Sequence, residues 1–273
     1  YRVNLTNDVN AGTNTITGVD RPLFRFRSQG SLSQVLRNSV IQSLEVLNEE
    51  PFVGDISLPS SDEIKQRVFG FYATQNRAVT IQDYQSICYG MPAKFGSVKR
   101  AAVVRDFDEF KRNLNIYVIS EDTSGKLLPA NMSLKNNLRN WLLQYKVVND
   151  TVDILDADII NFKIQYTVVT DLNANRFTVI SRANAALSNF IIKNQYEIGE
   201  SIVITDFYKV LQKVSGIVDV VDLEIVDAIG PSYANSSFNF EDALSADGRR
   251  IEGKSNAVFE LKFPNVDIQG AIR

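Results

Sequence analysis

The stretch Ile160-Asn161-Phe162-Lys163-Ile164-Gln165-Tyr166-Thr167-Val168 carries the clearest secondary-structure signal in this chain of 273 residues. Apolar and polar side chains alternate along it without interruption. In a β-strand, such alternation places the apolar residues on one face of a sheet and the polar residues on the other. We therefore predict a strand here with one buried face and one solvent-facing face.

Helical periodicity lies on both sides of this strand. After it, apolar residues recur at helical spacing over 179–191, a shorter helix is expected over 206–214, and a strand over 217–226. Before it, a strongly amphipathic helix has one apolar face, made up of Leu134, Leu138, Trp141, Leu142 and Tyr145. Together these patterns predict an α+β fold, in which helices pack on small, largely antiparallel sheets.

Two further helices are expected closer to the N-terminus. Ser61 is predicted to cap the first, because Asp62 and Glu63 then occupy the favourable first turn. Its apolar face would consist of Ile64, Val68, Phe71 and Tyr72. Thr80-Ile81-Gln82-Asp83 resembles a capping box with Asp in place of Glu and begins the second helix, which should end near Gly90. Two strands, 98–105 and 114–120, are expected to follow.

The segment from Thr80 to Val98 resembles the segment from Thr205 to Val218. In each, a capped helix with an Asp–aromatic pair leads through a Gly-x-Val turn into a strand. One interpretation is a repeated helix-to-strand unit. The other is coincidence, because capped helices that precede strands are common, and the sequence leaves both open.

Four segments follow from these patterns. We predict a strand- and turn-rich N-terminal segment (1–60), a first α/β unit (61–150), a second α/β unit (151–226) and a loop-rich C-terminal extension (227–273) that closes with a strand over 257–263. Within the first segment, residues 31–48 fit a helix or a strand equally well. The chain opens on Tyr1 with a pattern that is already strand-like, so we expect it to be part of a longer protein.

Composition excludes several classes of function. The chain has no histidine, which rules out His-based triads and most zinc sites. Its single cysteine, Cys88, cannot form an internal disulfide, and its apolar neighbours indicate a buried position. Charges of both signs are scattered over a chain of net charge -3, and its basic clusters are short, such as Arg25-Phe26-Arg27 and Lys99-Arg100. We therefore expect no nucleic-acid partner. No stretch approaches the ~18 apolar residues of a spanning helix, so no membrane insertion is expected.

Residues 248–255, Gly248-Arg249-Arg250-Ile251-Glu252-Gly253-Lys254-Ser255, match the phosphate-loop pattern G-x-x-x-x-G-K-[ST]. That loop binds nucleotides only where a strand leads in and a helix leads out. Here turn-like residues precede it, and 257–263 alternates like a strand. We expect a polar loop, and a nucleotide-binding hydrolase that uses Lys254 and Ser255 is the alternative.

Carboxylates gather in two places and could in principle hold a hard cation or serve as acid and base. The first group is Asp150, Asp153, Asp156 and Asp158, and the second is Asp106, Asp108 and Glu109. The first lacks the glycine and the spacing of a calcium loop, and the second lies beside Arg105, Lys111 and Arg112, so solvated turns are expected. We predict no catalytic residue, no cofactor, no metal site and no small-molecule substrate.

The segment Arg77-Ala78-Val79-Thr80-Ile81-Gln82-Asp83-Tyr84-Gln85-Ser86-Ile87 resembles the hallmark of the baseplate J-like family of contractile tails, which reads approximately R-A-V-T-x-x-D-Y after an acidic-capped helix. The hallmark region covers residues 61–104. Over 105–226 the order of elements is similar to the C-terminal part of the inner-ring wedge subunits of T-even phage baseplates.

The resemblance implies a non-enzymatic structural protein of the virion, made late in infection and assembled in the bacterial host cytoplasm. Such a subunit would form a homodimer and a ring around the central hub and bind other baseplate wedge proteins. It would also take part in the rearrangement that triggers sheath contraction. Thr80 and Asp83 would then be structural. A receptor-binding tail module, suggested by the Asn- and Ser-rich C-terminal stretch, is a further alternative.

Overall fold

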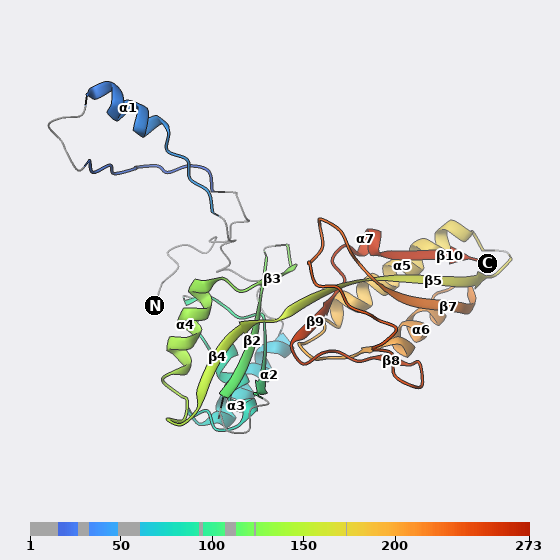
Figure 1. Cartoon of the computed structure of the whole chain (residues 1–273). Coiled ribbons are helices and arrows are strands. Elements are labelled where there is room, and N and C mark those ends of the chain that lie inside the picture. The colour runs from blue at the N-terminus through green and yellow to red at the C-terminus, as the bar shows by residue number, and fades with distance from the viewer. Residues whose placement is uncertain are drawn as a thin grey trace.

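The computed structural model describes residues 16–26, 33–48, 61–92, 95–106, 113–122, 124–172 and 174–273, and the statements below concern these residues. Figure 1 shows an elongated molecule with an arm and two units that follow one another along its length. The arm consists of residues 16–26 and 33–48. The first unit contains α2 to α4 and β1 to β4, and the second contains β5 to β10 and α5 to α7.

The first unit is built around β2 (Asn113–Glu121). This strand pairs antiparallel with β1 (Arg100–Arg105) and β3 (Leu127–Pro129) and parallel with β4 (Thr151–Asp156). The helices of this unit are α2 (Ser61–Thr74), α3 (Ile81–Tyr89) and α4 (Met132–Leu142). The predicted apolar face of α4 is confirmed, since Leu134, Leu138 and Leu142 are buried and Trp141 and Tyr145 pack against the same core.

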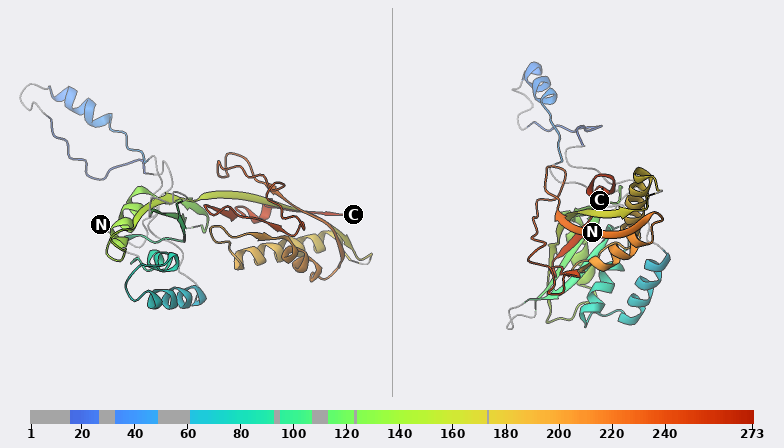
Figure 2. Two further views of the ribbon diagram at one scale, coloured as in Figure 1. Left: turned by 60° about the horizontal axis from the view of Figure 1, so that its bottom comes forward. Right: turned by 90° about the vertical axis from the view of Figure 1, so that its right-hand side faces the viewer.

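The second unit is built around β5 (Asp158–Thr170), the strand predicted first. It pairs antiparallel with β7 (Ile217–Asp227) and parallel with β9 (Ala257–Glu260) and β10 (Ile268–Ile272). Helices α5 (Arg176–Lys193) and α6 (Ile204–Gln212) pack on one face of this sheet (Figure 2). A short helix, α7 (Pro264–Asp267), and the ribbon of β6 (Ile202–Val203) and β8 (Arg250–Ile251) complete the unit.

The predicted α+β class is confirmed. Four of the seven strand pairings among the described residues are antiparallel and three are parallel. Among the helices in the described part of the chain, none is both long and apolar enough to cross a membrane. The boundaries of the four predicted segments stay predictions, but the sheets cross two of these boundaries. Strand β4 lies beyond the boundary at residue 150 and belongs to the sheet of the first unit, and β9 and β10 lie beyond the boundary at residue 226 and belong to the sheet of the second unit.

The similar segments share their turns but differ in their helix caps. Gly96 and Gly216 have φ of +101° and +98°, and a Cβ on either would approach Leu134 or Val179 to 2.6 or 2.7 Å. Each glycine therefore allows close contact with a neighbouring helix before β1 or β7 begins. The prediction of two capped helices is wrong for the second, because Thr205 lies inside α6 and the cap position makes no side-chain hydrogen bond.

Three further predictions need correction. Only Phe71 of the predicted α2 face packs on the core, whereas Ile64, Val68 and Tyr72 are exposed. Ser61, predicted as the cap, is the first residue of α2 itself. The alternation predicts that Asn161 lies on the solvent-facing side of β5, but its side chain is buried.

Residues 34–42 form α1 (Gln34–Gln42), so the helical alternative holds within the described part of 31–48. Arg27, Asp108, Glu109, Lys111 and Arg112 lie outside the described residues.

Candidate functional site at the junction of the two units

The hallmark segment begins with a capping box, as predicted. Thr80 Oγ1 accepts a hydrogen bond from Asp83 N at 3.2 Å, and Asp83 Oδ2 accepts from Thr80 N at 2.8 Å and from Val79 N at 3.2 Å. Burial alone would raise the pKa of Asp83, but these hydrogen bonds to the ionised carboxylate lower it below its usual value. The box therefore ends the preceding turn and starts α3 at Ile81.

The rest of the hallmark ties α3 to the end of α4 and the turn that follows. Ala78 is fully buried, and its N–H donates to Tyr145 O at 2.9 Å. Tyr84 OH donates to Asp150 Oδ2 at 2.8 Å, and Trp141 Nε1 donates to Ile87 O at 2.9 Å. Burial and the nearby Asp150 carboxylate raise the pKa of Tyr84. These residues act as a brace inside the first unit.

The two units meet in a small apolar core of their own. Ile119 comes from β2 of the first unit, Ile159 from β5 and Val258 from β9 of the second, and all three are buried. Leu127 of β3 and Tyr196, just after α5, pack against the same cluster. Because both units supply its side chains, separating them would expose this apolar surface to water.

Arg100 connects the units on one side of this core. Its side chain is only 4% exposed. Nη2 donates to Gln195 Oε1 at 2.7 Å, Nε donates to Tyr196 O at 3.3 Å, and Nε lies 3.3 Å from Glu197 Oε1. A guanidinium suits this position because its planar fork serves several acceptors at once.

Glu260 connects the units on the other side. One carboxylate oxygen accepts from Leu127 N in the first unit at 2.7 Å, and the other accepts from Asn161 Nδ2 at 2.9 Å. The amide oxygen of Asn161 accepts from Ala234 N at 2.7 Å, which explains why this polar residue is buried. Burial raises the pKa of Glu260, although its hydrogen bonds and the charges of Lys262 and Lys126 oppose the shift.

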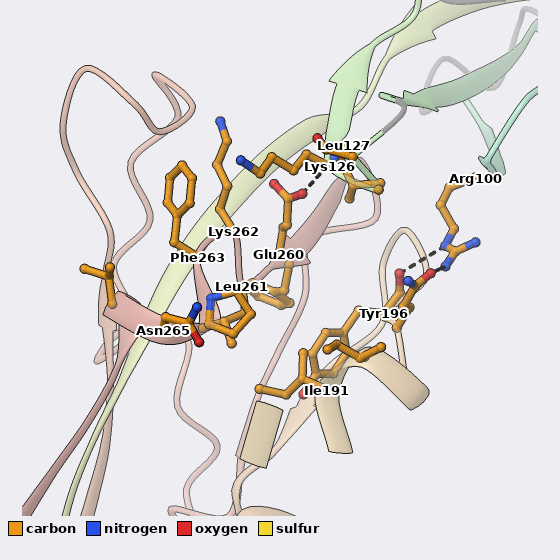
Figure 3. A pocket seen from close by; sticks show the side chains of 17 residues that line it. Arg100, Lys126, Leu127, Ile191, Tyr196, Glu260, Leu261, Lys262, Phe263 and Asn265 are labelled. Carbon is orange, nitrogen blue, oxygen red and sulfur yellow. Dashed lines mark hydrogen bonds between the residues drawn. The ribbon is translucent and has the colours of Figure 1, made fainter. Parts of the chain in front are cut away.

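A cavity of about 490 Å³ lies between these two connections. Figure 3 shows side chains of both units around it, with Arg100 and Tyr196 at one end and Lys126, Glu260 and Lys262 at the other. Lys126 Nζ lies 4.2 Å from the ring centroid of Phe263. The polar groups Arg100 and Glu260 are already engaged in contacts between the units. The arrangement can therefore hold the two units in one orientation.

The four aspartates Asp150, Asp153, Asp156 and Asp158, which the sequence places close together, do not converge on one point. Each member has a partner of its own: Asp150 with Tyr84, Asp153 with Asn113, Asp156 with Lys135 and Asp158 with Asn256. Within the part of the chain that the structure describes, no cluster of three or more acidic or cysteine side chains could hold a metal ion.

The loop 248–255 lies against a neighbouring backbone. Arg250 and Ile251 form β8, and the predicted strand after the loop is confirmed over Ala257–Glu260. A Cβ on Gly253 would approach Glu200 O to 2.5 Å, so the glycine lets two backbone segments meet. Lys254 Nζ lies 5.4 Å from the ring centroid of Phe238. The element that directly follows the loop is strand β9, whereas a phosphate-binding loop requires a helix in that position.

Sequence reasoning missed the residues that join the units. Lys99 and Arg100 were noted only as a basic cluster, yet both are buried, and Lys99 Nζ lies 2.8 Å from Glu121 Oε2. Cys88 is buried as predicted, and burial raises its pKa to about 12. The signal for Arg100 and Glu260 is weak, because charged residues within short strands usually face solvent.

The junction defines an α+β protein of two units clamped together by buried polar contacts. No protein family model matches the chain, and no curated protein matches it. In fold, it is similar to a chain of the cryo-EM structure of the anti-feeding prophage (AFP) baseplate, with a TM-score of 0.45 and 14% identity. The match covers 80% of this chain and 45% of that chain, so this chain spans less than half of that protein's length.

Proposed function

We propose that this chain is a structural, non-enzymatic subunit of a contractile tail baseplate. The observation that carries the proposal is the hallmark segment, in which Thr80 and Asp83 cap α3 and Tyr84 bonds to Asp150. Their contacts are those expected of structural residues, as the resemblance to the baseplate J-like family implies. The AFP similarity agrees with the proposal but is too distant to carry it.

In this proposal the subunit forms a homodimer, joins a ring around the central hub and binds other wedge proteins of the virion. The clamped junction supports such a role. A subunit that takes part in a large rearrangement must transmit displacement between its contacts, and a rigid body does so without absorbing it internally. Arg100 and Glu260 fix the two units relative to each other from opposite sides of a shared apolar core.

The test is co-assembly. The full chain is co-expressed with the other wedge proteins of the same tail, and complexes are purified through a tag on one partner and measured by light scattering and cryo-electron microscopy. We expect the chain at a stoichiometric position in the baseplate. A chain that stays monomeric at high concentration and is missing from purified tails would contradict the proposal.

The hydrolase alternative has its own measurement. ATP with Mg²⁺ is added to the wild type and to Lys254→Ala, and melting temperature and phosphate release are followed. Under our proposal neither quantity responds to nucleotide in either protein. A thermal shift that the substitution abolishes would favour the hydrolase.

A further inference from the structure

The arm exposes an apolar helix. None of the nine residues of α1, all of them described, is buried. Leu36 and Val40 lie one helical turn apart, and Leu44 continues their spacing just past the end of the helix, with all three exposed. A helix of this length is marginal in water, and in proteins most helical stability comes from the packing of an apolar face. This helix therefore needs a surface to cover it.

Contacts within the arm join residues 16–26 to residues 33–48. They leave the apolar row of Leu36, Val40 and Leu44 exposed. Ile16 N donates to Asn48 Oδ1 at 2.9 Å, and Arg37 lies 5.8 Å from the Phe26 ring centroid. Within residues 16–26, Phe24 stacks on Phe26 with ring centroids 6.4 Å apart. Arg25, from the basic cluster noted in the sequence, therefore lies between two phenylalanines that pack within the arm.

The first unit exposes a second row with the same spacing. Ile64, Val68 and Tyr72 follow one another at every fourth position along α2, and Tyr72 is 84% exposed. Phe69, 78% exposed, widens the row. Rows of side chains four residues apart are the ridges that interlock when two helices pack, so the α1 and α2 rows are complementary in form.

We propose that α1 of one copy packs on α2 of a second copy, and that the two copies exchange their arms reciprocally. The proposal deepens the homodimer of the preceding section and rests on it. In Figures 1 and 2 the arm extends away from its own first unit on the side opposite to α2, which favours a neighbouring chain as the acceptor.

The size of the contact favours a reciprocal exchange. A nine-residue helix is about 14 Å long and about 10 Å wide. One such contact buries far less than the ~1,200 Å² in total that stable interfaces need. A twofold arrangement doubles the helix contact, because it contains two copies of the pairing of α1 with α2. In such a symmetric dimer α1 of each copy contacts α2 of the other, so both copies use the same pair of surfaces.

The first experiment measures dimer dissociation of the full chain by sedimentation. Val68→Glu and Leu36→Glu each place a charge in the proposed contact, and each should weaken the dimer at least about tenfold. The two together should add little to either alone, because they break the same contact. The control is Leu172→Glu, which places the same charge at an exposed leucine in a turn of the second unit and should leave the dimer unchanged.

The second experiment identifies the acceptor. Chains that carry Leu36→Cys and one tag are mixed with chains that carry Tyr72→Cys and another tag, and disulfides are formed by mild oxidation. Cys88 is buried and should not compete. Cross-links between differently tagged chains support the exchange.

Three outcomes overturn the exchange. In the first, a chain with both cysteines cross-links only to itself at every concentration, so the arm covers its own α2. In the second, the dimer persists unchanged in Val68→Glu and Leu36→Glu, so its contact lies elsewhere and the proposed function stands. In the third, both variants dimerise normally but lose a wedge protein, so that protein covers α2. Absence of the wild-type chain from purified tails would instead refute the proposed function itself.

Discussion

Replacing Arg100 should separate the folding of the two units. Arg100→Met keeps an unbranched apolar stem but removes the donors to Gln195 and Tyr196 and the ion pair with Glu197. Gln195 is exposed and Tyr196 is half-buried, so water replaces part of what is lost, and an acceptor left unsatisfied in a fully buried position costs about 1–3 kcal/mol. Removing one partner of a fully buried ion pair costs about 3–5 kcal/mol.

The expected loss of stability in Arg100→Met is smaller than that of breaking a fully buried ion pair. Glu197 is 51% exposed, so water recovers part of its interaction. Methionine also avoids the desolvation of a guanidinium. We expect a loss of about 2–3 kcal/mol in the free energy of unfolding, which at a urea m-value of about 2–3 kcal/mol/M lowers the midpoint by about 1 M.

The assay is urea unfolding followed with two probes. Trp141 is the only tryptophan and lies in the first unit, so its fluorescence reports that unit, while far-UV circular dichroism reports both. We expect coincident transitions in the wild type and separated ones in Arg100→Met. The control is Lys209→Met, which breaks an exposed pair with Asp206 and should change stability by less than about 0.5 kcal/mol. A stability of Arg100→Met within that range, with coincident transitions, would refute the clamp.

Three further predictions follow from single contacts. Because burial raises the folded-state pKa of Glu260, its contribution to stability is fully present below the unfolded value of about 4.5 and is lost as pH rises through the folded pKa. The stability of the wild type relative to Glu260→Gln, from urea titrations at pH 4 to 7.5, should therefore fall as pH rises. Thr80→Ala removes the α3 cap and should cost about 1 kcal/mol, whereas Thr205→Ala, inside α6, should cost less. Gly253→Ala forces a Cβ against the backbone of Glu200 and should cost about 1–3 kcal/mol by thermal unfolding.

Each of these has a contrary outcome. A stability difference for Glu260→Gln that does not depend on pH would mean that the carboxyl is ordinarily solvated in the folded protein. Equal losses in Thr80→Ala and Thr205→Ala would remove the distinction between the two helix starts. If Gly253→Ala were as stable as the wild type, the loop could not lie as close to the backbone of Glu200 as the structure places it.

Local pattern determined the elements with strong periodicity. The alternation over 160–168 specified β5, and the apolar rows specified α4 and α5, because burial on one face imposes a period of two or 3.6 on the sequence itself. The capping box at Thr80 was readable for the same reason, since its partner Asp83 is three residues away. The hallmark around it is equally local, and it carries the proposed baseplate role.

Only the tertiary structure decided how these elements face one another. Arg100 and Gln195 are 95 residues apart in the chain, and Leu127 and Glu260 are 133 apart, so no local period records either contact. The α2 row shows the opposite effect. Its period predicted a helix correctly, but a period cannot say whether an apolar face is covered by the chain's own core. In this protein Ile64, Val68 and Tyr72 face outward, which is why the dimer contact is proposed there.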